Sequence, residues 1–148
     1  MKDKEKYLEM IAPCGYYRYG CPAYVNTTCT DEVVADNMAK RANVSIKNIR
    51  MCEGCRATNG KPHGSLCPTY DCCVNQKQLD FCYECEDFPC LKLAPISQGA
   101  DVRTHNSKIY NLLMLKKLGM DAYIKKGKDW WILYARGKSP VPGDDPQI

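Results

Sequence analysis

The chain has 148 residues, 11 cysteines and a formal net charge of +4. No stretch approaches the roughly 18 consecutive apolar residues that a transmembrane helix needs, which argues against a membrane protein. The charged start, Met1–Lys6, leads into only a short apolar stretch and does not resemble a secretory signal. We therefore expect a cytoplasmic protein, and in a reducing cytosol closely spaced cysteines favour metal binding over disulfides.

The positive charge is concentrated toward the C-terminus. Residues 103–148 hold 9 Lys and Arg against 4 Asp and Glu, whereas residues 1–102 hold 12 against 13. This count treats every cysteine as neutral, but a zinc ion bound by four thiolates carries a charge of about −2. Two such sites would bring the chain close to neutrality, so its basicity is a weak argument for nucleic-acid binding.

The first 51 residues combine short helical patterns with isolated cysteines. Residues 1–12 form a short amphipathic segment that ends at Pro13. Thr30-Asp31 is typical of a helix N-cap, and the apolar spacing that follows predicts a helix over about 31–42. A second short helix is expected from Ser45. The candidate buried residues of these segments are Tyr7, Leu8, Ile11, Val34, Met38, Ala39, Ala42, Ile46 and Ile49.

Residues 52–90 hold eight of the 11 cysteines, with Gly and Pro between them. This composition predicts loops folded on metal, with short helices over 74–79 and 91–93. The helical spacing of apolar residues from Ile109 to Leu118 then predicts a helix that stops at Gly119. We expect Asp121 to cap a further helix. Residues 130–134 are apolar and aromatic, and residues 139–148 contain three prolines and are expected to be disordered.

Two Cys-x-x-Cys pairs, Cys52–Cys55 and Cys82–Cys85, carry the strongest chemical signal. A tight turn of this spacing aims two sulfurs at one ion, and Gly54 eases the first turn. Buried free cysteines are the plainer interpretation, but their number and polar neighbours favour metal. A redox interpretation is disfavoured because neither pair follows a good strand, as a thioredoxin-like motif would.

Tetrahedral thiolate sites suit zinc or an iron–sulfur cluster. The run Cys82-x2-Cys85-x4-Cys90 resembles a cluster-binding motif only loosely, because Pro89 precedes the last cysteine instead of following it. We therefore expect zinc, as two ions, with an iron–sulfur cluster as the less favoured cofactor. The candidate ligands are Cys14, Cys21, Cys52, Cys55, Cys67, Cys72, Cys73, Cys82, Cys85 and Cys90.

The division of these ligands between two sites is open. One site would use Cys52, Cys55, Cys67 and either Cys72 or Cys73. The other would use Cys82, Cys85, Cys90 and either Cys14 or Cys21. In an interleaved alternative, the two Cys-x-x-Cys turns share one ion.

The sequence shows no set of residues typical of a catalytic centre. His63 and His105 are the only histidines, and each is best interpreted as a solvated residue. Nothing suggests a Ser/His/Asp or Cys/His arrangement, a dinucleotide-binding motif or a phosphate-binding loop. The pair Glu86-Asp87 is typical of a solvated turn. The protein is therefore expected not to be an enzyme.

Several motifs resemble the bacterial and archaeal cysteine-rich family called domain of unknown function 3795. They are Cys14-Gly15, Cys21–Tyr24, Cys52–Cys55, the run Cys82–Cys90 with its Phe-Pro-Cys ending, and the later segment Asn111–Gly119. The resemblance extends from about residue 10 to 127 and implies a small zinc-binding domain with no established activity. Members often carry a cysteine where this chain has Arg18. That site then uses fewer cysteines or a different geometry, with Cys29 or His63 as substitutes.

Together these observations predict a small, mostly α, irregular domain stabilised by zinc over residues 10–100, with a helical segment over 101–138 packed on it. Its role would be structural or would involve an unknown protein partner. One alternative is a metalloenzyme or redox protein with an open metal site or a cluster. Another is nucleic-acid binding, which the sequence disfavours, by the basic and aromatic residues Lys116, Lys117, Lys125, Lys126, Lys128, Trp130, Trp131 and Tyr134.

Overall fold

Short helical elements joined by turns make up the computed structural model, which describes residues 2–21, 23–28, 32, 35–36, 39–40, 43–49, 52–62, 64–93 and 107–125. Within these ranges there is no strand, and two isolated β-bridges pair Ile11 with Tyr17 and Tyr24 with Cys52. The protein is therefore small, partly helical and rich in cysteine. No described helix is long and apolar enough to cross a membrane.

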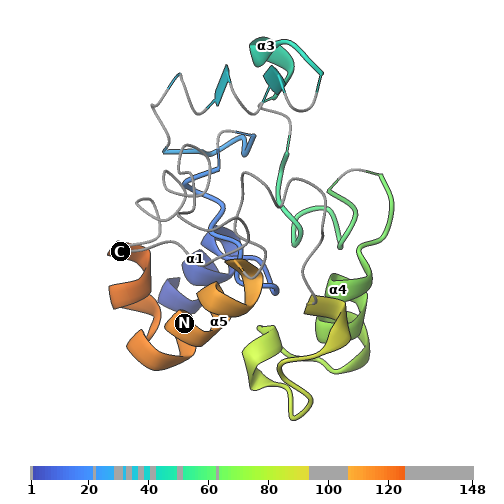
Figure 1. The fold of residues 1–148 in the computed structure, drawn as a ribbon, viewed down its shortest axis with the longest axis vertical. Coiled ribbons are helices and arrows are strands. Elements are labelled where there is room, and N and C mark those ends of the chain that lie inside the picture. Colours follow the sequence, from blue (N-terminus) through green and yellow to red (C-terminus); the bar gives the residue numbers. More distant parts are fainter. Residues whose placement is uncertain are drawn as a thin grey trace, which may run out of the picture.

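The N-terminal helices largely follow the predicted pattern. Helix α1 (Lys2–Met10) leads into the fully buried Ile11, which confirms this residue as an apolar anchor. Residues 32, 35–36 and 39–40 are helical, in agreement with the helix predicted over 31–42. There Lys40 forms an ion pair with Asp36, one helical turn away, at 2.5 Å. The short helix expected after Ser45 is α3 (Ile46–Ile49), which lies apart from the other labelled helices in Figure 1.

The helix within the cysteine-dense segment starts earlier than the sequence predicted. Helix α4 (Pro68–Tyr70) continues directly into a π-helical stretch, η1 (Asp71–Gln76). Proline is favourable in a first helical turn because its missing N–H group has no helical acceptor there. The helix predicted over 74–79 therefore starts at Pro68 and ends before Gln78, whose φ is +55°. Two 3-10 turns follow, η2 (Cys82–Glu84) and η3 (Leu91–Leu93), and η3 lies where it was predicted.

The C-terminal part confirms the predicted helix and its stop. Helix α5 (Ser107–Leu118) ends at Gly119, whose φ of +78° favours glycine. Residues 120–125 are again helical. The expectation that Asp121 caps this second helix was wrong: the helix begins at Met120, and the Tyr123 amide donates to the Gly119 carbonyl. The Asp121 carboxylate instead accepts a hydrogen bond from the Tyr7 hydroxyl on α1.

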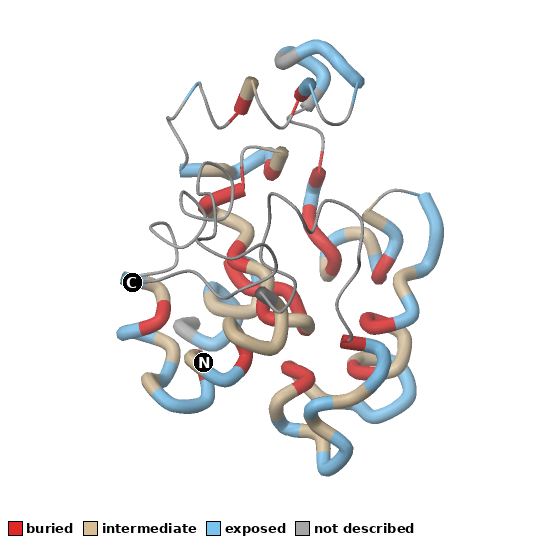
Figure 2. Tube along the Cα trace, in the orientation of Figure 1, coloured by how far each residue is buried: buried red, intermediate tan, exposed pale blue. Residues whose placement is uncertain are grey.

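One core joins the cysteine-rich part to the C-terminal helices. Figure 1 shows α5 beside α1, and Figure 2 shows buried residues concentrated where these segments meet. Burial of aromatic and aliphatic side chains supplies the apolar contribution to stability. An aromatic contact adds to this stability: the Tyr123 and Tyr17 rings meet edge-on, with their centres 6.4 Å apart. The largest fully buried side chains are Tyr24, Tyr123, Ile11, Leu93, Leu112 and Leu115.

Candidate metal centre

The first cysteine group surrounds Arg18 and consists of Cys14, Cys21, Cys52 and Cys55. The Cys52–Cys55 turn is held by backbone hydrogen bonds from Cys52 to Ala23 (2.9 Å) and from Val25 to Cys52 (3.0 Å). Gly54 has a φ of +93°, and an added Cβ there would lie 3.3 Å from the Tyr24 ring. The predicted tight turn is therefore present, and it is packed against the segment that carries Cys21.

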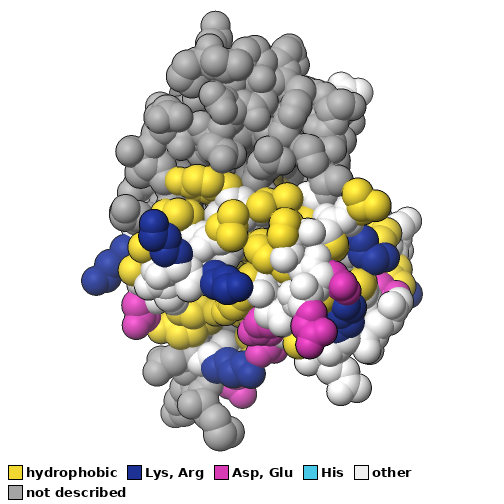
Figure 3. All heavy atoms as spheres, turned by 60° about the horizontal axis from the view of Figure 1, so that its bottom comes forward, with side chains coloured by type: hydrophobic (Ala, Val, Ile, Leu, Met, Phe, Trp, Pro, Cys, Tyr) yellow, Lys and Arg dark blue, Asp and Glu magenta, His cyan; other side chains and the backbone are white. Residues whose placement is uncertain are grey.

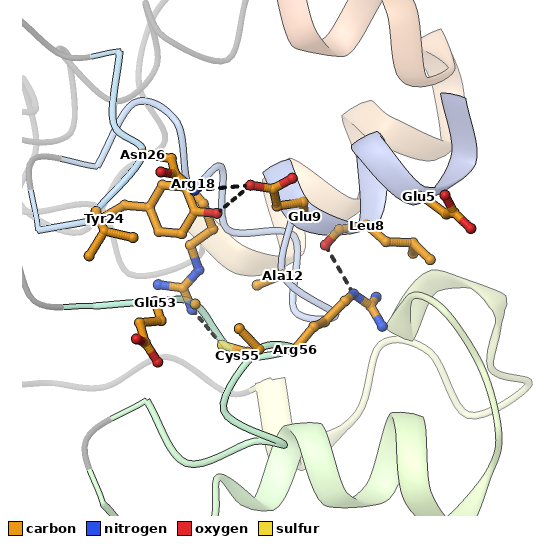
Figure 4. Close-up of a pocket in the computed structure, with 13 residues that line it drawn as sticks. Glu5, Leu8, Glu9, Ala12, Arg18, Tyr24, Asn26, Glu53, Cys55 and Arg56 are labelled. Atoms are coloured by element: carbon orange, nitrogen blue, oxygen red, sulfur yellow. Dashed lines mark hydrogen bonds between the residues drawn. The ribbon is translucent and has the colours of Figure 1, made fainter. Parts of the chain in front are cut away.

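Arg18 lies at the centre of this group. Its Nη2 donates to the Cys55 Sγ at 2.6 Å, and its guanidinium lies 5.4 Å from the centre of the Tyr16 ring. Its Nε is buried and has no hydrogen-bond partner among the described residues. Burial alone lowers the pKa of the Arg18 guanidinium, but the sulfurs of the group, with Cys55 first, together raise that pKa above its ordinary value. Figure 4 shows the side chain reaching from its loop toward Cys55.

Burial is the largest influence on the pKa of two thiols in this group. It raises the pKa of Cys55 and of Cys21, although the Arg18 charge acts in the opposite direction on both. A cavity of about 480 Å³ opens beside them and is shown in Figure 4. Its charged lining is mixed, since Arg18 and Arg56 face Glu5, Glu9 and Glu53 across it.

Arg56 connects this group to α1 and to the segment that precedes η2, a role that no sequence pattern indicated. Its Nε donates to the Leu8 carbonyl at 3.0 Å, and its Nη2 donates to the Asp80 carbonyl at 2.5 Å. Its guanidinium also lies 5.6 Å from the centre of the Phe81 ring. Because both acceptors are backbone carbonyls far away in the chain, no side-chain motif could have pointed to this role.

The second cysteine group consists of Cys72, Cys73, Cys82, Cys85 and Cys90. Together with Thr69, Lys92 and the apolar Phe88 and Leu93, these five cysteines line one small cavity of about 30 Å³. The π-helical stretch η1 contributes the first two cysteines and η2 contributes Cys82. Two turns bring Cys85 and Cys90 back to this cavity. In them the Cys85 amide donates to the Cys82 carbonyl (3.2 Å) and the Phe88 amide donates to the Cys85 carbonyl (3.1 Å).

Two thiols of the second group are directly paired. A side-chain hydrogen bond between Cys82 and Cys73 lowers the pKa of Cys73 and raises the pKa of Cys82. The Cys73 Sγ also lies 3.5 Å from the Leu79 carbonyl oxygen, to which it donates. A thiol that loses its proton more readily is better prepared to bind a metal, because the thiolate is the ligand form.

Lys77 approaches the second group from outside the cavity. Its Nζ donates to the Cys85 Sγ at 3.1 Å and to the Asp87 carboxylate at 2.5 Å. Asp87 first, and then Cys85, raise the pKa of the Lys77 ammonium. Hydrogen bonds of this kind orient sulfur ligands and stabilise their negative charge.

Cys14 links the two groups. Its sulfur acts on the pKa of Cys55 in the first group and of Cys82 in the second. The backbone explains this position, since the Cys82 amide donates to the carbonyl of Pro13 at 2.9 Å. Cys67 lies with the first group, where its charge acts on Cys55.

The arrangement agrees in part with the first division of ligands that the sequence suggested, since Cys82, Cys85 and Cys90 lie together and Cys67 lies near Cys55. It differs in that Cys72 and Cys73 lie with Cys82, Cys85 and Cys90, whereas Cys14 and Cys21 lie around Arg18 with Cys52 and Cys55. All ten described cysteines are free thiols. Within the described ranges no three metal-binding side chains converge on one point, so ligation itself stays a prediction. Cys29, His63 and His105 lie outside the described residues, as do Lys126, Lys128, Trp130, Trp131, Tyr134 and the tail 139–148.

A family model described as a protein of unknown function, DUF3795, matches residues 10–95. The chain belongs to this family. The match covers both cysteine groups and ends before α5, so the resemblance noted over residues 111–119 lies outside it. No curated protein and no solved structure matches the chain. Membership of the DUF3795 family establishes no activity, and the function must be argued from the cysteines themselves.

Proposed function

We propose that this DUF3795 protein binds zinc through the second cysteine group, and that the ion has a structural role. The observation that carries the proposal is the cavity of about 30 Å³ lined by Cys72, Cys73, Cys82, Cys85 and Cys90. A cavity needs about 10–15 Å³ to hold one water molecule. The space between these thiols is therefore large enough for a single ion with its sulfur ligands drawn inward.

The donor chemistry of the group fits zinc. A set of thiols without histidine or carboxylate in the cavity lining suits a soft tetrahedral site, which is typical of structural zinc. A four-iron cluster contains eight heavy atoms, and the walls would have to move apart to admit it. Neighbouring cysteines rarely bind the same ion together, so we expect one of Cys72 and Cys73 to be spare. The other would join Cys82, Cys85 and Cys90.

A structural role follows from what the ion would connect. The segment 68–76 and the segment 82–93 are short helical turns and loops that bury few large apolar side chains. Four sulfur–metal bonds would fix these two segments to each other, and binding and folding would be coupled. When bound, the zinc ion supplies crosslinking; Lys77 and the backbone turns orient the thiols that hold it.

Nucleic-acid binding is the less favoured function. Lys116, Lys117 and Lys125 are exposed, but the face presented in Figure 3 shows Lys and Arg side chains spread singly among acidic and apolar ones. Binding to phosphates normally requires a continuous basic surface. This face therefore offers little support for the basic and aromatic segment as a nucleic-acid interface.

The proposal is tested by the zinc content of the purified full chain, compared with Cys85→Ser, Cys90→Ser and a control, Cys67→Ser. Cys67 is also half-buried but lies outside the second group. Zinc should be present in the wild type and in the control, and it should be lost from the two other variants. Zinc retained in both Cys85→Ser and Cys90→Ser, or absent from the wild type, would contradict the proposal.

A further inference from the structure

We infer that the Arg18 guanidinium occupies the first cysteine group in place of a metal ion, so that the chain binds about one zinc ion and not two. This inference rests on the proposed function, because it assigns the single ion to the second group. It revises the expectation of two ions that the number of cysteines suggested. The argument has three parts: the position of the guanidinium, its charge, and the contrast with the second group.

The guanidinium lies against one of the sulfurs that a metal ion in this group would have to bind. It donates to the Cys55 Sγ at 2.6 Å, and the sulfurs of Cys14, Cys21 and Cys52 lie close enough to act on it electrostatically. A zinc ion bound to these sulfurs would need Zn–S distances of about 2.3 Å. An ion at that distance from Cys55 would compete for the space that the Arg18 nitrogen now occupies.

The charge of Arg18 also opposes a second cation. Arginine stays protonated in proteins, so this position always carries one positive charge. None of the described carboxylates forms an ion pair with Arg18, and its guanidinium also lies over the face of the Tyr16 ring. A divalent ion a few ångströms away would therefore be repelled by the guanidinium charge, and the two cations would compete for the same sulfurs.

The second group differs in this respect. Among the described residues its cavity is lined by thiols and by no guanidinium. Two lysines are near it: Lys92 lines the cavity and is itself exposed, and Lys77 reaches Cys85 from an exposed position where it also pairs with Asp87. The first group thus has a guanidinium bonded to one of its sulfurs, whereas the five thiols of the second group border one small cavity. The same contrast argues against an open, water-bearing metal site at the first group, since Arg18 fills the place that a missing cysteine ligand would leave.

The experiment measures bound metal per chain in the wild type and in two substitutions of Arg18. Arg18→Ala removes the guanidinium, whereas Arg18→Lys keeps a positive charge and serves as the matched control. Zinc is measured by elemental analysis after loading with excess zinc and desalting. Cobalt substitution gives a second readout, because tetrahedral cobalt–thiolate sites absorb visible light. We expect about one ion in the wild type and in Arg18→Lys, and about two in Arg18→Ala.

Two ions in the wild type would overturn the inference. A single ion in a folded Arg18→Ala would also overturn it. Both results would leave the proposed function standing. If neither the wild type nor the two variants bound an ion, the inference and the proposed function would both be overturned. A further variant keeps the inference testable if Arg18→Ala does not fold. Cys55→Ser in the wild-type background should still bind about one ion, and loss of that ion from a folded Cys55→Ser would place the metal in the first group and contradict the inference.

Discussion

The hydroxyl of Tyr123 donates a hydrogen bond to the backbone carbonyl of Gly15 at 2.9 Å, and both groups are buried. The two residues are 108 positions apart in the chain. Gly15 directly follows Cys14, the cysteine that links the two groups, so this bond fastens the C-terminal helices to the cysteine-rich part. The family match ends at residue 95, and Tyr123 therefore supports the matched region from outside it.

Substitution of Tyr123 by Phe should lower the free energy of unfolding by about 1–3 kcal/mol, because the Gly15 carbonyl would be left buried without a partner. Urea unfolding followed by circular dichroism measures this change. Tyr83→Phe is the control, since Tyr83 is half-buried and stacks on Phe81 at 5.7 Å, a contact that Phe preserves. An equal loss in both variants would show that the Tyr123 hydrogen bond has no special importance.

Gly15→Ala should lower the free energy of unfolding more than Gly64→Ala does. Both glycines have a positive φ, +83° and +87°, so each substitution carries a backbone cost of about 1–2 kcal/mol. At Gly15 the new Cβ would also lie 2.9 Å from the Leu112 side chain, whereas at Gly64 it would meet no atom of the described residues within 4 Å. Overpacking adds about 1–3 kcal/mol. Equal unfolding free energies for the two variants would contradict the close packing of α5 on Gly15.

Lys77→Met should weaken zinc binding by several-fold, up to about tenfold, because Cys85 would lose a charged hydrogen-bond donor. Competition with a chromophoric chelator measures the zinc dissociation constant. Lys61→Met is the matched control, since Lys61 is exposed and is not one of the residues that line the cavity of the second group. If Lys77→Met binds zinc as tightly as Lys61→Met, the hydrogen bond from Lys77 to Cys85 does not contribute to zinc affinity.

Removal of the metal should destabilise the fold. A chelator added to the zinc-loaded chain should lower the melting temperature, because an ion bound only by the folded state adds its binding free energy to stability. Cys85→Ser, which is expected to bind no zinc, should melt at the same temperature with and without chelator. An unchanged melting temperature in the zinc-loaded wild type would mean that the ion does not stabilise the fold.

Local signals in the sequence predicted several elements well. Helix α5 was recognisable because apolar residues recur at helical spacing and Gly119 ends them with the positive φ that glycine favours. The start of α4 was missed, although Pro68 was available as a first-turn signal. Asp121 was misassigned as a cap because its partner, Tyr7, is brought to it only by the packing of α1 against the C-terminal helices.

The cysteines could be recognised as a set, but their grouping could not. Spacing identified the two Cys-x-x-Cys turns. The backbone hydrogen bond from the Cys82 amide to the Pro13 carbonyl and the contacts of Arg56 join residues far apart in the chain, which spacing does not predict. Arg18 was noticed only as a residue in a place where a cysteine was expected. Its hydrogen bond to Cys55 gives that departure a physical meaning.

X-ray absorption at the zinc edge of the purified full chain tests the central claim most directly, because it reports which atoms surround the ion. The account predicts zinc with four sulfur neighbours at about 2.3 Å and no nitrogen or oxygen neighbour. The same spectrum should disappear in Cys85→Ser and persist in Cys55→Ser. A first shell that contains nitrogen or oxygen, or iron in place of zinc, would contradict a closed structural zinc site in the second cysteine group.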